Sequence, residues 1–258
     1  MHYKEYGDES ADFMLLVHGG GVSGWMWDSQ LDFFRGYHLL VPDLPEHGAS
    51  RDGAPFSITD SAERLLALIE EKSRGKKVIL IGFSLGAQIV AQMVGMKPTS
   101  IDYAIINSAL AKPMPHAQKW MLPLARLTAP LVRSRLFSRL QAKTLYVNDR
   151  DLDRYFEDSR QTKPDALIRV LKENMSFRIP DGFGQSTASI LVTVGEKERA
   201  VMKQSAQALA AANSNATGIV ISGIGHGVSM AMPAFFNEMI DSWIREGRLP
   251  DKCRVIHD

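Results

Sequence analysis

The stretch "ILIGFSLGAQIV", Ile79 to Val90, decides the fold. A run of β-branched and apolar residues ends at Gly82, and Ser84 then stands alone between Gly82 and Gly86. The residues after Gly86 have the composition of a helix, with no further break. The pattern G-x-S-x-G between a strand and a helix predicts a tight turn, in which side chains at the two glycine positions would collide with neighbouring elements. Such a turn presents the Ser84 hydroxyl at the carboxyl end of a sheet, where open α/β sheets bind ligands.

Continuous apolar runs recur along the chain and predict strands that are buried on both faces, as in a parallel sheet. The predicted strands are Phe13–Val17, His38–Pro42, Val78–Gly82, Tyr103–Asn107, Ile190–Gly195 and Thr217–Ile221. Helix-like segments lie between them, and the last one begins at Pro233 and ends at Gly247. This alternation predicts an α/β fold with a doubly wound, mostly parallel sheet.

The alternation of strands and helices stops between about Ala111 and Asp181, where prolines separate several short helical stretches. This region is too long for a plain connection between a strand and a helix. We interpret residues 111–181 as a helical cap inserted into a core made of residues 1–110 and 182–258. Four large side chains of this region either line an apolar pocket or belong to ordinary core packing: Met114, Trp120, Met121 and Met175.

Composition narrows the class of protein. The chain has 258 residues, of which 45% are hydrophobic, and its formal net charge of +1 gives no reason to expect a nucleic-acid partner. The single cysteine, Cys253, can form neither an internal disulfide nor a thiolate metal site. The N-terminal "MHYKEYGDES" lacks the apolar core of a signal peptide, and no apolar run approaches the roughly 18–20 residues of a membrane span. We expect a soluble, cytoplasmic protein; monomer and dimer both stay open.

The motif at Ser84 resembles the α/β-hydrolase superfamily, and the resemblance covers nearly the whole chain apart from the cap. It implies that Ser84 is a nucleophile and that the backbone N–H of Leu85 donates to the oxyanion of the intermediate. The family's second oxyanion donor follows a His-Gly pair, which in "VHGGGVSGWMW" (Val17 to Trp27) corresponds to Gly20. A run of glycines can also cradle phosphate, but no G-K-[ST] follows here, so a P-loop is not favoured.

The same resemblance implies the partners of Ser84. The family places its general base after the last strand, where "GIGHGVSM" carries His226, whereas His18 and His47 are interpreted as structural. Its acid often lies three residues past a glycine after the penultimate strand, and counting from Gly195 gives Glu198. Many relatives carry Asp there, Glu196 is the second candidate, and a solvated charged loop is the simpler interpretation of "EKER".

Charged residues of the insertion are open to other interpretations. Between Tyr103 and Asn148 there are seven Lys and Arg residues and no Asp or Glu. Such a stretch could attract acidic substrates or a membrane surface, but the interleaved Leu, Met and Trp residues favour amphipathic helices with a solvated basic face. Asp149, Asp151 and Asp153 have the spacing of a calcium loop, yet Arg154 stands where that loop needs glycine. Glu46 falls where the family often has glycine, and the sequence gives it no role.

We therefore expect a serine hydrolase that cleaves a small, largely apolar ester or related carbonyl compound without a cofactor or metal. Ser84 would be the nucleophile, His226 the general base, Glu198 the orienting acid, and Gly20 and Leu85 the oxyanion hole. Two alternatives share these residues: a ligand-binding receptor with a slow or vestigial triad, and a lyase, similar to hydroxynitrile lyases, that uses the serine and histidine without an acyl-enzyme.

Overall fold

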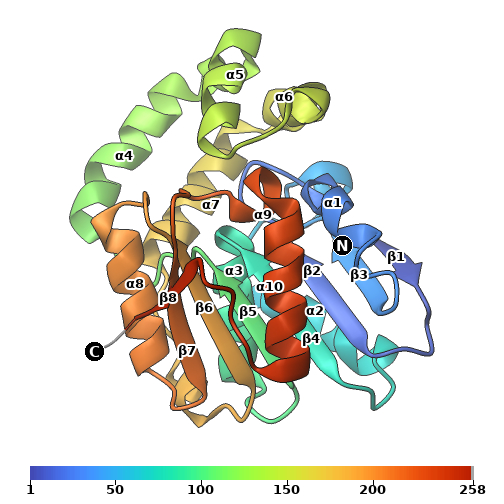
Figure 1. The fold of residues 1–258 in the computed structure, drawn as a ribbon. Helices are drawn as coiled ribbons and strands as arrows, with labels where there is room; N and C mark the ends of the chain where they lie inside the picture. The colour runs from blue at the N-terminus through green and yellow to red at the C-terminus, as the bar shows by residue number, and fades with distance from the viewer. Residues whose placement is uncertain (257–258) are drawn as a thin grey trace.

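An eight-stranded sheet runs through the centre of the molecule (Figure 1). The computed structural model describes residues 1–256 of the chain. The strands are hydrogen-bonded in the order β1-β3-β2-β4-β5-β6-β7-β8. Their bounds are β1 Tyr3–Gly7, β2 Phe13–Val17, β3 His38–Pro42, β4 Val78–Phe83, β5 Tyr103–Asn107, β6 Ser189–Gly195, β7 Ala216–Ile221 and β8 Cys253–Val255.

The inner strands β2 to β7 are parallel to one another, and the two edge strands run antiparallel to their neighbours. This arrangement confirms the predicted fold class, and the six predicted strands match β2 to β7 to within one residue at each end. The sequence analysis missed β1 and β8. Both are partly exposed and β8 has only three residues, so neither shows the continuous apolar run of a buried strand.

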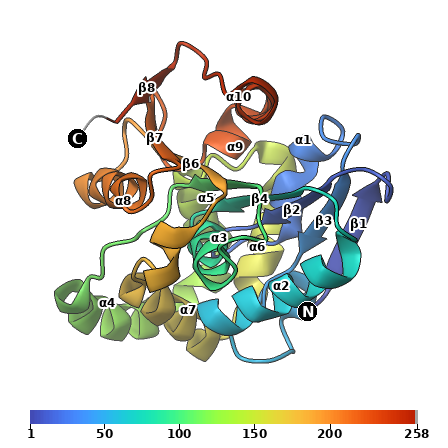
Figure 2. The ribbon, with the colours of Figure 1, turned by 90° about the horizontal axis from the view of Figure 1, so that it is seen from below.

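Helices cover both faces of the sheet, because successive side chains of each strand point to opposite faces. Leu15 of β2 packs in the core shared with α2, α3 and α8, whereas Leu16 packs in the core shared with α9 and α10. Figure 2 shows α9 and α10 on one side of the strands and α2 and α3 on the other. The bounds are α1 Asp28–Leu31, α2 Ile58–Lys72, α3 Leu85–Met96, α8 Ala200–Ala211, α9 Val228–Ala231 and α10 Pro233–Glu246.

Between β5 and β6 the chain forms helices and loops only, as the sequence predicts. The elements are α4 Pro115–Thr128, the 3-10 helix η3 Ala129–Arg133, α5 Arg135–Thr144, η4 Asp149–Asp151, α6 Leu152–Gln161, α7 Pro164–Ser176 and η5 Asp181–Gln185. In Figure 1, α4, α5 and α6 stand at the top, beyond the sheet. α4 packs against α7, and α5 packs against α6. That residues 111–181 behave as a separate domain stays a prediction.

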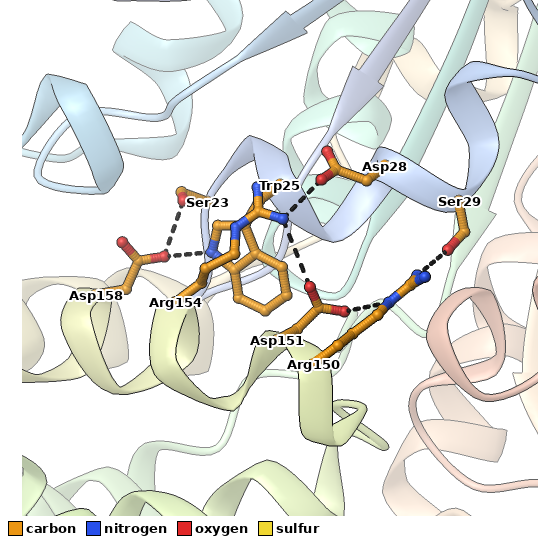
Figure 3. A network of polar contacts seen from close by, with 8 residues as sticks. All are labelled: Ser23, Trp25, Asp28, Ser29, Arg150, Asp151, Arg154 and Asp158. Carbon is orange, nitrogen blue, oxygen red and sulfur yellow. Dashed lines mark hydrogen bonds and ion pairs between the residues drawn. The ribbon is translucent and has the colours of Figure 1, made fainter.

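Polar contacts connect α6 to the loop that follows β2 (Figure 3). One carboxylate oxygen of Asp158 accepts hydrogen bonds from the Ser23 hydroxyl at 2.8 Å and from the Trp25 indole N–H at 2.7 Å. One turn earlier, Arg154 forms an ion pair with Asp28 at 2.6 Å. The insertion is thus held to the segment that directly follows the glycine run.

Candidate active site

Ser84 lies at the turn between β4 and α3 in a strained backbone conformation, with φ 52° and ψ −110°. A Cβ atom on Gly82 would stand 2.4 Å from the carbonyl oxygen of Gly86, and one on Gly86 would stand 2.2 Å from that of Val17. No side chain fits at either distance, so the turn requires both glycines. The Ser84 N–H donates to the Asn107 carbonyl at the end of β5, at 2.8 Å. The strained turn is therefore fixed from the neighbouring strand.

The loops after β6 and β7 bring an acid and a histidine to Ser84. Nε2 of His226 lies 3.0 Å from Oγ of Ser84. Nδ1 of the same ring lies 2.7 Å from a carboxylate oxygen of Glu198. The three predicted residues thus form one hydrogen-bonded chain, in the order serine, imidazole and carboxylate.

Glu198 is buried, with a side chain 3% exposed, yet its environment favours the charged form. Burial alone would raise its pKa, but hydrogen bonds from His226, from the Gly195 N–H and from the Ser108 hydroxyl outweigh burial and lower the pKa. The Gly195 and Ser108 donors lie 2.8 and 2.7 Å from the same carboxylate oxygen. The other oxygen therefore faces the histidine alone.

Ser108 is a residue of this site that the sequence analysis missed. It follows β5 directly, is buried, and has a positive φ of 58°. Its position in the sequence could have indicated it. Ser108 is a polar residue at the carboxyl end of a predicted central strand, and Ser84 was expected at the same edge of the sheet.

Glu196, the second candidate for the acid, points elsewhere. It accepts hydrogen bonds from the Gly223 N–H and from Arg254. The Gly223 hydrogen bond is the main cause of its lowered pKa. Within residues 1–256 it has no hydrogen bond to His226, so the structure brings Glu198 rather than Glu196 to the imidazole.

The glycine run after β2 lies beside Ser84. Gly20, Ser84 and Leu85 all line the same cavity. Leu85 is the first residue of α3, so its N–H has no partner within the helix. Gly21 has a positive φ of 77°, and a Cβ on Gly19 would lie 2.8 Å from the Phe83 ring. The loop thus turns closely around the residue that precedes Ser84.

His18 and His47 have structural contacts, as predicted. Nε2 of His18 accepts from the Leu44 N–H at 2.9 Å, and Nδ1 lies 2.7 Å from the Gly19 carbonyl. Burial lowers the pKa of His18 to about 3, so the ring is neutral. Nδ1 of His47 lies 2.9 Å from the Pro45 carbonyl, and burial lowers its pKa as well.

A cavity of about 410 Å³ opens above Ser84, between the sheet and the inserted helices. Most side chains that line it from the insertion are apolar or uncharged, and they include Ala125, Val132, Phe137, Leu145, Tyr155 and Val170. The four large side chains considered from the sequence do not line it. Met175 is buried in the protein, whereas Trp120 is 82% exposed and Met121 is 42% exposed. Both exposed residues lie on α4.

Glu46, to which the sequence gave no role, lies in the cavity wall. Its carboxylate forms a two-point ion pair with Arg169 of α7, with both distances 2.9 Å, and accepts from the Phe56 N–H at 3.0 Å. Burial opposes ionisation of Glu46, but these donors lower its pKa. A residue that looked like a departure from the family's glycine thus binds the insertion to the loop after β3.

Within residues 1–256, no group of three or more His, Cys, Asp or Glu side chains is placed to hold a metal ion. No helix of this part of the chain is both long and apolar enough to cross a membrane.

Comparison with known proteins identifies the family to which the chain belongs. A profile described as the alpha/beta hydrolase family matches residues 14–239. An AB hydrolase superfamily protein of Gibberella zeae is 36% identical over 107 residues, which are 41% of this chain and only 38% of that relative.

Two solved structures share the fold over nearly their whole length. An alpha/beta hydrolase enzyme from a Medee basin deep-sea metagenome library has a TM-score of 0.81 at 19% identity, covering 96% of this chain and 95% of that one. A thermophilic esterase from Thermogutta terrifontis has a TM-score of 0.75 at 20% identity, covering 95% and 93%. At these identities the likeness is one of fold.

Proposed function

Because the chain belongs to the alpha/beta hydrolase family, we propose that it is a serine hydrolase that cleaves a small, largely apolar ester or related carbonyl compound through an acyl-enzyme. The observation that carries the proposal is the hydrogen-bonded chain from Ser84, which lines the cavity, through His226 to Glu198. This arrangement of nucleophile, base and orienting acid is the one that acyl transfer requires.

In the proposed mechanism, Nε2 of His226 takes the Ser84 proton as Oγ attacks the substrate carbonyl. The N–H groups of Gly20 and Leu85 donate to the oxyanion that forms, and losing one such donor typically costs about 10²–10³ in rate. The imidazolium then gives its proton to the leaving alcohol, which leaves an acyl group on Ser84. Water, deprotonated by His226, releases the acid in the second half of the reaction.

The cavity supports an uncharged, largely apolar substrate. Glu46 is the one acidic residue among those that line it, and no Lys or Arg of residues 1–256 lines it. The Glu46 charge is already paired with Arg169. A charged substrate group would lose its hydration there without gaining a partner, which is costly.

A fluorophosphonate probe combined with p-nitrophenyl esters of increasing acyl length tests the proposal. We expect one covalent label, located on Ser84 by peptide mass analysis, and turnover of the shorter apolar esters. Ser84→Ala should abolish both, while Ser100→Ala, which changes an exposed serine, should keep both. A label on another serine, or unchanged turnover in Ser84→Ala, would contradict the proposal. A Ser84 label without turnover of any ester would instead favour the lyase or the receptor.

A further inference from the structure

Exposed apolar side chains gather on one part of the molecule, formed by α4, η3 and α5. Residues 1–256 contain nine large hydrophobic side chains in the exposed class, and seven of them fall between positions 120 and 140. They are Trp120, Met121, Leu124, Leu127, Leu131, Leu136 and Leu140. A concentration of this kind on a folded protein marks an interaction surface more often than chance exposure does.

Helical spacing places three of these side chains on one face of α4. Trp120, Leu124 and Leu127 follow one another at intervals of four and three residues, which is the repeat of a single helix face, and Leu131 follows in η3. Trp120 is 82% exposed and Leu127 is 78% exposed, and α4 has no buried residue. The amphipathic pattern seen in the sequence is therefore real, but its apolar side faces solvent.

Other side chains of the same helices line the cavity. Ala125 and Thr128 of α4, Val132 of η3, and Phe137 and Gln141 of α5 all border it. These elements thus form part of the cavity wall and also carry the exposed leucines.

The charged residues of the stretch that carries these side chains are all basic. All seven basic residues between Tyr103 and Asn148 are exposed, and this stretch contains no acid. Arg126 and Arg135 form ion pairs with Asp165 and Asp153 of other helices. The remaining five have no ion-pair partner within the described residues: Lys112, Lys119, Arg133, Arg139 and Lys143.

We propose that this surface, called here the α4–α5 patch and defined by the seven apolar and five unpaired basic residues above, docks on a membrane that contains anionic lipids. Exposed Trp and Leu side chains enter the boundary between headgroups and acyl chains, and Lys and Arg pair with anionic headgroups. A second copy of the chain fits less well, because like patches would oppose basic charge to basic charge. Nucleic acid would leave the leucines in water.

Docking in this way would bring the cavity wall to the lipid surface, where apolar substrates concentrate. The patch and Ser84 use different residues, however, so binding to lipid does not depend on the proposed hydrolysis. The two proposals can therefore fail separately.

Vesicle flotation with the full chain tests the patch. We expect the protein to float with vesicles of phosphatidylcholine containing phosphatidylglycerol and to stay in solution with phosphatidylcholine alone. Added salt should weaken the binding because it screens the charges. Neutralising three basic residues (Arg133→Gln, Arg139→Gln and Lys143→Gln) should lower the partition coefficient by about a hundredfold. Replacing three leucines (Leu124→Ser, Leu127→Ser and Leu131→Ser) should lower it at least about tenfold.

A matched control uses an apolar and a basic residue that lie outside the patch. Phe33 and Arg35 are both exposed and precede β3, at the amino end of the strands. The variant with Phe33→Ser and Arg35→Gln should bind vesicles within about twofold of the wild type. Brominated lipids should quench the wild-type fluorescence, and Trp120→Phe should remove most of that quenching.

Three results would overturn the docking proposal. One is failure of the wild type to bind the anionic vesicles. Another is unchanged binding in either triple variant, with folding verified by circular dichroism. The third is a wild-type dimer in gel filtration that the leucine variant converts to a monomer, since the patch would then be a contact between copies.

Discussion

At the scale of single residues, the site depends on how a buried carboxylate keeps its charge. Glu198 stays ionised because Gly195 and Ser108 donate to one oxygen, which leaves the other for His226. The donors also fix the direction of the carboxylate. In the proposed mechanism, this fixes the Nδ1 proton of His226 toward Glu198 and leaves Nε2 free to accept the Ser84 proton.

Glu198→Gln is expected to lower kcat at least about a hundredfold with KM little changed. The amide oxygen of Gln can still accept from Gly195 and Ser108, but its NH₂ group would then face Nδ1 and favour the wrong tautomer of the imidazole. Glu196→Gln is the matched control, because Glu196 is partly exposed and is hydrogen-bonded to Gly223 and Arg254 instead of His226. Steady-state kinetics on one p-nitrophenyl ester checks both variants. Similar rates for the two variants would remove Glu198 from its proposed role.

The pH dependence of protein stability tests the Glu198→Gln variant in a second way. The pKa of Glu198 is lower in the folded protein, so its contribution to stability is present above the unfolded pKa and is lost as the pH falls through the folded pKa. Urea unfolding of Glu198→Gln should therefore depend less steeply on pH in the acidic range than that of the wild type.

At the scale of elements, helix α3 connects Ser84 to the insertion. Ser84 is the residue before α3, and Gln88, four residues later, forms hydrogen bonds near both ends of the insertion. Gln88 is buried and donates to the carbonyls of Leu110 and Asn174, at 2.7 and 2.9 Å. The Asn174 side chain donates back to Gln88 at 2.9 Å. Leu110 lies just before the insertion, and Asn174 lies in α7, its last α-helix. The Gln88 side chain therefore links α3 to the chain at both ends of the insertion.

Gln88→Met is expected to destabilise the protein by about 2–3 kcal/mol, because it leaves buried polar groups of Leu110 and Asn174 without partners. The shape of the side chain is nearly kept, so loss of packing contributes little. Chemical denaturation measures the change. Gln92→Met is the matched control one turn further along α3, where the side chain is not fully buried. A cost for Gln88→Met no larger than that of the control would show that the amide does not hold the insertion.

Prediction from the sequence succeeded where the signal was local. The apolar runs gave the inner strands, and two glycines around a serine gave the turn at Ser84, because both depend on near neighbours in the chain. Ser108, Gln88 and the Glu46–Arg169 pair were not found, since each acquires its role through a contact far away in sequence. The insertion was predicted to be helical, but which side of α4 faces solvent depends on α7 and on the cavity, which the period of α4 alone does not reveal.

At the scale of the whole molecule, a polar seam joins the insertion to the loops of the sheet, beside apolar packing that includes Ala142 and Tyr155. Glu46 and Arg169 pair on one side, and Asp158, Arg154 and their partners form the contacts of Figure 3. Polar contacts depend on direction and on charge, so the stability that this seam contributes can change with pH. Within this seam, Asp158 is the residue to test, because burial raises the pKa of its carboxyl group despite two hydrogen bonds.

Asp158→Asn is expected to leave the protein as stable as the wild type or more stable at neutral pH. The amide oxygen can still accept from Ser23 and Trp25, and the cost of a buried charge disappears. Because the folded pKa is raised, the wild type loses stability as the pH rises from the ordinary range of an Asp through the folded value, and Asp158→Asn should not show this loss. Asp158→Ala removes both acceptors and should cost about 1–3 kcal/mol at every pH. Thermal unfolding of the three proteins between acidic and neutral pH compares them. If Asp158→Asn were as unstable as Asp158→Ala at neutral pH, the negative charge itself would hold α6 to the glycine loop, and the seam would be an electrostatic contact rather than a hydrogen-bonded one.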